Sequence, residues 1–207
     1  MALTVRRITA AQHLAHIAAR AGGSGLVSAL QVPGWGTVKS DWRDESIGWF
    51  DGEALVGAGL VLYRQVPRVP RYLAYLPEGP DIDWLGEGPA ARGVVGAPEV
   101  VHALPEWLDP MLDHLKAAGA FAAKIGPPIW VRRWQASTLK AAISAGEAGA
   151  LRELPADETD GRALAVADIL EVTGWTQKPS TGAGFGDVQP RYVFQLPLAG
   201  RTEDDLL

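Results

Sequence analysis

The chain alternates between stretches in which apolar residues recur at helical spacing and stretches with a strand-like pattern. The first helical stretch begins with Thr9–Gln12, which has the form of a capping box, and it stops before Gly22-Gly23. Leu108, Met111 and Leu115 fall at helical spacing later in the chain. The pattern predicts helices over residues 9–21, about 33–42, 104–118, about 137–145 and about 161–172.

Between these helices the apolar residues form short continuous runs, which are typical of strands. Residues 46–50 and 54–63 are joined by Asp51-Gly52, the strongest short-range signal for a hairpin. Residues 71–76 and 120–125 end in turns that contain proline and glycine. Residues 191–197 form the last predicted strand. We expect loop insertions near residues 86–104 and 146–160.

Composition narrows the classes of function. The chain has 207 residues and no cysteine, which excludes disulfides, zinc–thiolate sites and thiol nucleophiles. No stretch approaches the roughly 20 apolar residues that cross a bilayer. The formal net charge of −5 argues against a grip on nucleic acid through the whole surface, but it leaves a local basic groove open.

Two glycine-rich stretches resemble phosphate-binding loops. Arg20–Gly25 fits the R-x-x-G-x-G pattern of acyl-CoA pyrophosphate loops, which requires backbone N–H groups between a strand and a helix. Here the stretch follows a helix, so a C-capping turn is the preferred interpretation. Gly182–Gly186 also lacks the flanking strand and helix, and we interpret it as a loop.

The titratable residues form no complete catalytic or metal-binding pattern. His13 and His16 lie three apart without a third ligand, so we expect them on a solvated helix face and not at a metal. Asp81 and Asp83 can do acid–base work, but such pairs are more typical of turns. The same holds for the pair on the predicted helix 104–118, Asp109 and Asp113.

Arg132-Arg133-Trp134 follows a Pro-Pro turn and joins two cations to an aromatic ring. Such a group can bind phosphate or stack on a base. The alternative is a solvated helix start whose Trp134 packs inward, because amphipathic side chains often bury only part of their length.

The stretch LQVPGWGTVKSDW, from Leu30 to Trp42, surrounds Lys39 with tryptophan, glycine and proline. Lys39 follows Trp35 by one helical turn, on a short predicted helix that Pro33 and Gly34 open. A lysine in this place can act as a point charge for phosphate. Spacing alone leaves open whether Lys39 does so or is a surface lysine.

Several stretches together resemble the FemABX family of peptidoglycan aminoacyltransferases, and the alanine-, glycine- and tryptophan-rich style is closest to actinobacterial, lipid II:glycine glycyltransferase-like members. LQVPGWGTVKSDW is similar to the family's Q-S-x-x-W-x-x-x-K pattern, with Val32 in place of the serine. The most specific stretch is YLAYLPEGP, Tyr72–Pro80. Two further stretches are similar to the family: KIGPP, Lys124–Pro128, and YVFQLPLAGRTEDDLL, from Tyr192 onward. Together the likeness covers most of residues 26–135 and 188–207.

The resemblance implies an α/β (α+β) fold made of GNAT domains, which have a mixed central sheet flanked by helices. Residues 1–187 would form the first GNAT-like domain, and residues 188–207 would begin a truncated second one. The acidic helix start at Thr202–Asp205 is followed by only two leucines. We therefore expect the chain to be the N-terminal part of a longer protein, inactive by itself.

The resemblance also implies an activity: tRNA-dependent transfer of an amino acid, glycine or another small one, to the stem-peptide amine of a peptidoglycan precursor. The partners would be aminoacyl-tRNA and UDP-MurNAc-pentapeptide or lipid II, with no cofactor and no metal. Lys39 would contact the precursor's phosphates, and Trp35, Tyr75 and Arg191 would line the substrate cleft. The catalytic residues are not assigned.

The implied location is the cytoplasm, with peripheral contact at the inner membrane face. Two alternatives stay open. One is an acyl-CoA-dependent GNAT N-acyltransferase, and the other is a non-catalytic domain that binds muropeptide.

Overall fold

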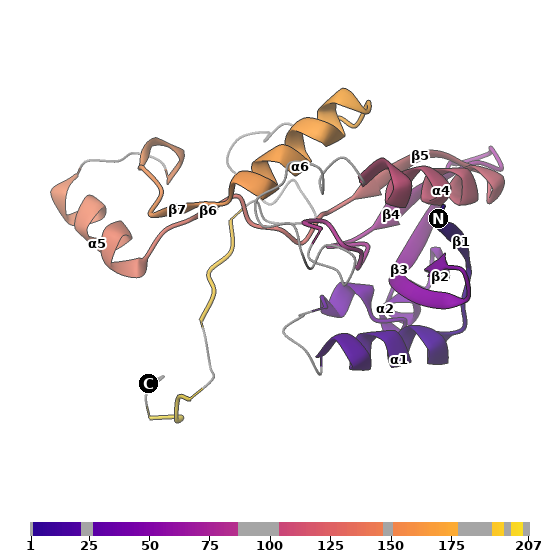
Figure 1. Ribbon diagram of the computed structural model, residues 1–207, viewed down its shortest axis with the longest axis horizontal. Helices are drawn as coiled ribbons and strands as arrows, with labels where there is room; N and C mark the ends of the chain where they lie inside the picture. Colours follow the sequence, from indigo (N-terminus) through magenta and orange to yellow (C-terminus); the bar gives the residue numbers. More distant parts are fainter. Residues whose placement is uncertain are drawn as a thin grey trace. The chain divides into compact units, whose positions relative to one another are not determined.

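A computed structural model describes residues 2–21, 27–86, 104–146, 151–177, 192–196 and 200–204 of the chain (Figure 1). The chain separates into two compact units, Met1–Gln177 and Lys178–Leu207. The helices and strands of the described residues all belong to the first unit.

The first unit is built on a five-stranded sheet whose strands follow one another in chain order. Neighbouring strands are antiparallel, except that β4 and β5 run parallel. Gly52, at φ 58°, makes the tight turn between β2 and β3, where Asp51-Gly52 predicted one. The strands are β1 (Thr4–Arg7), β2 (Arg43–Asp51), β3 (Ala54–Gln65), β4 (Tyr72–Leu76) and β5 (Ala120–Ile125).

Helices flank this sheet on both faces. The parallel strands β4 and β5 cannot be joined by a hairpin, and α4 (Leu104–Ala117) makes the crossover between them. α1 (Ala10–Ala21) contacts β2 and β3, and α2 (Gly34–Val38) contacts β2. Figure 1 shows α1 and α2 away from α4. The expected fold class, an α/β (α+β) fold with a mixed central sheet flanked by helices, is confirmed.

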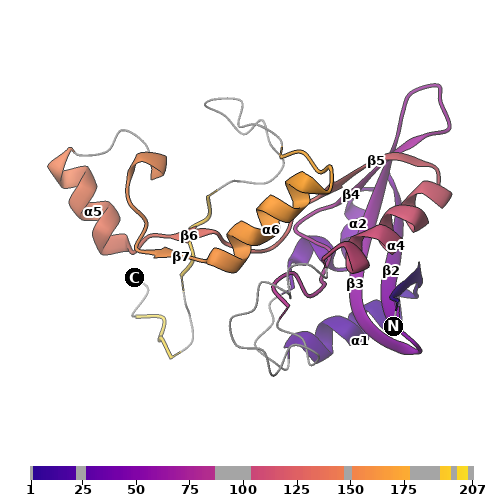
Figure 2. The same cartoon turned by 45° about the horizontal axis from the view of Figure 1, so that its top comes forward.

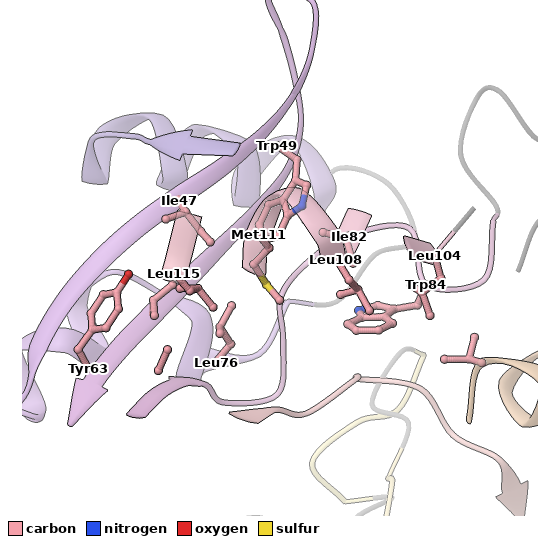
Figure 3. Packing of buried hydrophobic residues seen from close by; sticks show 13 residues of the cluster. Ile47, Trp49, Tyr63, Leu76, Ile82, Trp84, Leu104, Leu108, Met111 and Leu115 are labelled. Atoms are coloured by element: carbon pink, nitrogen blue, oxygen red, sulfur yellow. The ribbon is translucent and has the colours of Figure 1, made fainter. Parts of the chain in front are cut away.

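The main core lies between the sheet and α4 (Figure 3). Residues that alternate along β2 and β3, such as Ile47, Trp49 and Tyr63, point to this side because successive side chains of a strand face opposite ways. The Trp49 indole N–H donates to the backbone oxygen of Trp107 at 2.7 Å, which satisfies its polar atom. The helix contributes its buried face, Leu104, Leu108, Met111 and Leu115.

Residues 126–177 add a two-stranded sheet and two helices. β6 (Arg132–Arg133) pairs with β7 (Glu158–Thr159), and α5 (Ala136–Ala145) lies between them in the chain. Asp160 caps α6 (Gly161–Val172) by accepting from the N–H groups of Arg162 and Ala163. The described residues of this unit also include the short 3₁₀ turns η1 (Ala29–Gln31) and η3 (Leu151–Glu153).

Most predicted elements are confirmed within two or three residues. The capping box is present, since the Thr9 N–H donates to Gln12 Oε1 at 2.9 Å and the Gln12 N–H to Thr9 Oγ1 at 3.2 Å. The helix predicted over 33–42 is wrong in length, because α2 spans only Gly34–Val38. β1 was not predicted, since the edge strand TVRR lacks an apolar run.

Two further predictions about the second half need correction, and a third is confirmed. Residues 146–160 are not one loop, since η3 and β7 lie within them. Arg132 and Arg133 belong to a strand and not to a helix start. Trp134 is half-buried as predicted, and its indole N–H donates to the oxygen of Leu154 at 3.1 Å.

The second unit is described at residues 192–196 and 200–204. Residues 192–196 form no strand, contrary to the prediction, and their side chains are exposed. Phe194 is 98% exposed and Val193 74%. The described part of the helix start at Thr202 is a bend and turn.

Candidate functional site

The segment that carries Lys39 is fastened to the sheet by one buried side chain, that of Gln31. Gln31 is 1% exposed, and its Nε2 donates to the oxygen of Pro77 at 2.6 Å. Its Oε1 accepts from the N–H of Leu60 at 2.9 Å. β3 pairs with β4 only from Leu62 onward, so the amide of Gln31 satisfies a strand N–H that no neighbouring strand reaches.

The loop after β4 packs against the same glutamine. A Cβ on Gly79 would collide with Gln31 Cδ, so this position admits only glycine without displacement. The peptide bond between Gly79 and Pro80 is cis. The oxygen of Gly79 accepts from the N–H of Gly126 at 3.1 Å, which joins this loop to the chain just after β5.

Lys39 lies at the C-cap of α2, half-buried, and not inside the helix. Its Nζ is 5.7 Å from the centroid of the Trp35 ring, within the range of a cation–π contact. Its backbone N–H donates to the oxygens of Gly36 and Trp35, and its own oxygen accepts from Trp42 at 2.8 Å. The prediction that Lys39 and Trp35 share one side of this segment is therefore confirmed.

Strand register brings further residues to the same face of the sheet. Leu62, Tyr75 and Lys124 are neighbours across β3, β4 and β5. Lys124 Nζ lies 5.2 Å from the Tyr75 ring centroid, and the rings of Tyr75 and Trp42 are 6.4 Å apart.

Arg64 completes the group, since its Cζ lies 5.6 Å from the Trp42 ring centroid. We call these residues the cation–aromatic cluster: Trp35, Lys39, Trp42, Arg64, Tyr75 and Lys124. Three cationic side chains beside three aromatic rings suit a ligand that carries both anionic groups and a planar ring.

Three of the four predicted site residues come together here: Trp35 packs against the buried cluster that contains Tyr75, and Lys39 lies over the Trp35 ring. Arg191 lies outside the described residues. Sequence reasoning missed Trp42, Arg64 and Lys124. Each stands in or beside a stretch singled out from the sequence, but their proximity depends on the register of β3, β4 and β5, which periodicity does not reveal.

A second polar group lies under α1, and the prediction of a solvated face for His13 and His16 is wrong. His13 is 0% exposed, and its Nδ1 lies 2.9 Å from Ser46 Oγ. His16 Nε2 lies 3.0 Å from Asp81 Oδ2, and Arg20 pairs with the other carboxylate oxygen at 3.3 Å. The helix face that carries both histidines packs on β2 and β3, and a backbone bridge between Asp81 and Ala58 places the carboxylate there.

Burial lowers the pKa of His13 to about 4, with a further lowering by His16 and an opposing effect of Asp81. The imidazole is therefore neutral at pH 7.

The expected surface positions of Asp109 and Asp113 on α4 are confirmed, because both are exposed.

Among the described residues, no three histidine, aspartate or glutamate side chains gather as a metal site would require. No helix in the described part of the chain is long and apolar enough to span a membrane. The glycine-rich stretches Arg20–Gly25 and Gly182–Gly186 lie in part or wholly outside the described residues.

No family model matches the chain, and no curated protein matches it. Among solved structures, FemX is 21% identical over 69% of this chain, with a TM-score of 0.41, and the chain spans 31% of the FemX chain. An aminoglycoside acetyltransferase from an uncultured soil metagenomic sample is 8% identical over 91% of this chain and 97% of its own, with a TM-score of 0.38. A ribosomal-protein-alanine N-acetyltransferase from Brucella melitensis is 13% identical over 77% and 96% of the two chains, with a TM-score of 0.37. These likenesses concern the fold.

Proposed function

We propose that the chain is the acceptor-binding part of an N-acyltransferase with a GNAT-type fold, which transfers an amino acid from aminoacyl-tRNA to a peptidoglycan precursor. One observation carries the proposal. Three stretches that resemble the FemABX family, Leu30–Trp42, Tyr72–Pro80 and Lys124–Pro128, meet at one place. Gln31 bonds to Pro77, Gly126 bonds to Gly79, and Tyr75 contacts both Trp42 and Lys124.

The chemistry of the acceptor fits the cation–aromatic cluster. UDP-MurNAc-pentapeptide carries a diphosphate and a planar uracil, and lipid II carries a diphosphate. Lysine and arginine bind phosphate, and a base stacks on tryptophan or tyrosine. In this proposal Lys39 contacts the diphosphate, while Trp35, Trp42 and Tyr75 form the apolar wall beside it.

The reaction needs alignment more than reactive side chains. The stem-peptide amine attacks the ester carbonyl of the aminoacyl-tRNA, a C–N bond forms, and the C–O ester bond breaks. The tRNA hydroxyl leaves with the proton that the amine gives up. Such a step is accelerated by holding the amine near the ester and by stabilising the carbonyl oxyanion. The cluster would contribute the first of these, by positioning the acceptor.

An acyl-CoA-dependent reaction is the alternative, and the described loop after β4 does not favour it. A pyrophosphate is held by several backbone N–H groups that open a helix. Pro77 and Pro80 have no N–H, and Glu78 places a carboxylate between them. The Glu78 carboxylate accepts a hydrogen bond from Ser28.

Thermal unfolding with two ligands tests the proposal. We expect UDP-MurNAc-pentapeptide to raise the Tm and acetyl-CoA to leave it unchanged. At about 100 times Kd, binding stabilises the folded state by about 2.7 kcal/mol. Lys39→Ala should abolish this shift, whereas Lys140→Ala, an exposed lysine on α5, should preserve it. A shift with acetyl-CoA alone would overturn the proposal.

A transfer assay separates binding from catalysis. We expect no transfer of a labelled amino acid from tRNA to the precursor by this chain alone, because the proposal assigns it acceptor binding only. Transfer by the chain alone would contradict that restriction while leaving the acceptor class intact. Muropeptide binding with no transfer, even by a longer natural protein, would instead favour the non-catalytic alternative.

A further inference from the structure

The turn between β3 and β4 forms a basic hairpin, which we define as residues 64–71, RQVPRVPR. Arg64, Arg68 and Arg71 are exposed on it. Val69, at its end, is 44% exposed, and both neighbouring prolines, Pro67 and Pro70, are exposed as well. Figure 2 shows this loop reaching beyond the ends of α4 and β5.

The hairpin holds its own shape. The N–H of Val66 donates to the oxygen of Arg71 at 2.9 Å, and the N–H of Val69 donates to the oxygen of Val66 at 3.2 Å. The N–H of Arg71 in turn donates to the oxygen of Val69 at 2.8 Å. Two prolines restrict the backbone further. The exposed side chains are therefore presented by a preformed turn.

Positive charge is concentrated at this end of the first unit. Residues 54–77 contain no aspartate or glutamate, although the whole chain carries −5. Within the described part of the chain, the three hairpin arginines form no ion pair. Such a local field attracts a polyanion or an anionic surface despite the net charge.

Two more cations lie beside the base of the hairpin. Arg43 lies over the ring of Tyr72 at 4.6 Å and donates to the oxygen of Ala118 at 3.2 Å. Lys116 is exposed in the last turn of α4. The end of this helix lies close to β4, because the N–H of Tyr72 donates to the oxygen of Gly119, two residues after α4.

The acids nearby do not cancel this charge. Glu45 is engaged: burial alone would raise its pKa, but hydrogen bonds from His114 and Tyr63, with the charges of His114 and Arg43, hold it below the ordinary value. Asp113 lies exposed on α4, one turn before Lys116, and Asp41 and Asp44 are exposed beside Arg43 in the chain. Five cations therefore lie near three exposed acids, and the excess of positive charge is on the hairpin itself, which contains three arginines and no acid.

We propose that the basic hairpin docks the protein on an anionic membrane surface. Val69 and the two prolines enter the headgroup layer, and the arginines bind lipid phosphates around them. The exposed apolar residues favour a membrane over single-stranded RNA, because a membrane surface takes up apolar side chains, whereas the bases of single-stranded RNA stack on exposed aromatic rings. The hairpin residues include no aromatic ring.

Vesicle sedimentation of the full chain without any substrate tests this inference apart from the proposed enzymatic function. The probes are vesicles of phosphatidylcholine and vesicles of phosphatidylcholine and phosphatidylglycerol in equal amounts. Each arginine at an anionic surface contributes about fivefold in affinity. Arg68→Gln/Arg71→Gln should therefore weaken binding to the anionic vesicles by about 25-fold, while neutral vesicles bind weakly throughout.

The matched control is Arg132→Gln/Lys140→Gln, which removes the same charge from exposed positions on β6 and α5. It should retain binding to within about threefold, since these residues lie outside the hairpin. Val69→Ser keeps the charge and removes the apolar group, and it should give a smaller loss. Arg64 is left unchanged because it contacts Trp42.

Three outcomes would overturn the inference. One is equal loss in the hairpin and control variants, which would indicate a general charge effect. Another is no binding of the unaltered chain to anionic vesicles. The third is binding of a single-stranded RNA oligonucleotide, lost in Arg68→Gln/Arg71→Gln, without vesicle binding, which would assign the hairpin to nucleic acid instead. Circular dichroism of each variant excludes misfolding as the cause.

Discussion

His13 shows at the scale of one residue how burial changes the chemistry that a sequence suggests. Its ring is fully buried between α1 and the sheet, and Ser46 is its hydrogen-bond partner. Among the described residues, its Nε2 has no hydrogen-bond partner. A charged imidazole in this place would lose its hydration without gaining a carboxylate contact. The folded protein therefore keeps His13 neutral.

The lowered pKa of His13 predicts a loss of stability in acid. The unfolded chain binds a proton at His13 near pH 6.5, but the folded chain does so only near pH 4. As the pH falls through this window, the unfolded state gains protons first, so the free energy of unfolding decreases. We expect a decrease of about 2 kcal/mol between pH 7 and pH 5, measured by urea unfolding.

His13→Asn is the control for this prediction, because its amide can replace Nδ1 toward Ser46 and does not titrate. The variant should unfold with a flatter pH dependence over the same window. An unchanged slope in His13→Asn would contradict the assignment of the acid sensitivity to His13.

Gln31 is the second residue whose replacement has a clear expected cost. Removing its amide leaves the N–H of Leu60 and the oxygen of Pro77 buried without partners. Gln31→Ala should lower the free energy of unfolding by about 3 kcal/mol. Gln65→Ala, at an exposed position with one 3.5 Å contact, should cost less than about 0.5 kcal/mol. Similar losses in both variants would contradict the role of Gln31.

Single-residue spacing predicted part of the candidate site. The i, i+4 relation found the contact of Trp35 with Lys39, because it depends only on local geometry. Lys124 and Arg64 were missed, since their contacts with Tyr75 and Trp42 require the pairing of β3, β4 and β5. The burial of His13 was missed for a related reason: a helix face rich in polar residues packs inward only when the sheet supplies partners.

At the scale of elements, two glycines differ in what decides the effect of a substitution: backbone preference at Gly34, and side-chain packing at Gly79. In α2, a Cβ on Gly34 would meet nothing within 4 Å. In the loop after β4, a Cβ on Gly79 would collide with the side chain of Gln31. The same substitution therefore has opposite expected effects at the two positions.

Gly34→Ala should stabilise the protein by about 0.5 kcal/mol, because alanine is the better helix former and loses less entropy on folding. Gly79→Ala should destabilise it by at least about 2 kcal/mol, since Gln31 is buried and holds two hydrogen bonds. Chemical denaturation of both variants checks this. A stable Gly79→Ala protein would show that the loop can move away from Gln31.

Elements with a strong local signal were predictable from the sequence. The capping box at Thr9, the Asp51-Gly52 turn and the apolar face of α4 each specify a structure through neighbours in the chain. β1 has no such signal, since Thr4–Arg7 forms a strand only because β2 offers an edge. Residues 192–196 show the converse, a strand-like pattern that pairs with nothing in the described part of the chain.

At the scale of the whole molecule, these exposed apolar residues have a consequence for behaviour in solution. Tyr192, Val193, Phe194 and Leu196 are all at least 49% exposed. Segments in which exposed apolar, β-prone residues lie this close together in the chain associate with one another. We expect the average mass in sedimentation equilibrium to rise with protein concentration, and Val193→Ser/Phe194→Ser to remain monomeric. Concentration-independent mass for the unaltered chain would contradict this.

The meeting of Leu30–Trp42, Tyr72–Pro80 and Lys124–Pro128 is a property of the whole first unit. Their likeness to one family suggested a shared role, but only the folded chain shows that they lie together. The distance in sequence between Gln31 and Gly126 is bridged by strand order and by the crossover through α4. Pattern analysis of single segments carries no such information.

Because Gln31 takes the place of a strand neighbour at Leu60, the amide of Leu60 reports on the motion of Leu30–Trp42, the segment that carries Lys39. The N–H of Leu60 is protected by the side chain of Gln31 and not by a sheet partner. Its exchange with deuterium therefore measures how often that segment lifts from the sheet. A ligand held by Lys39 would slow exchange at Leu60 selectively. The amide of the next residue, Val61, points the other way, toward β2, and would serve as the internal reference.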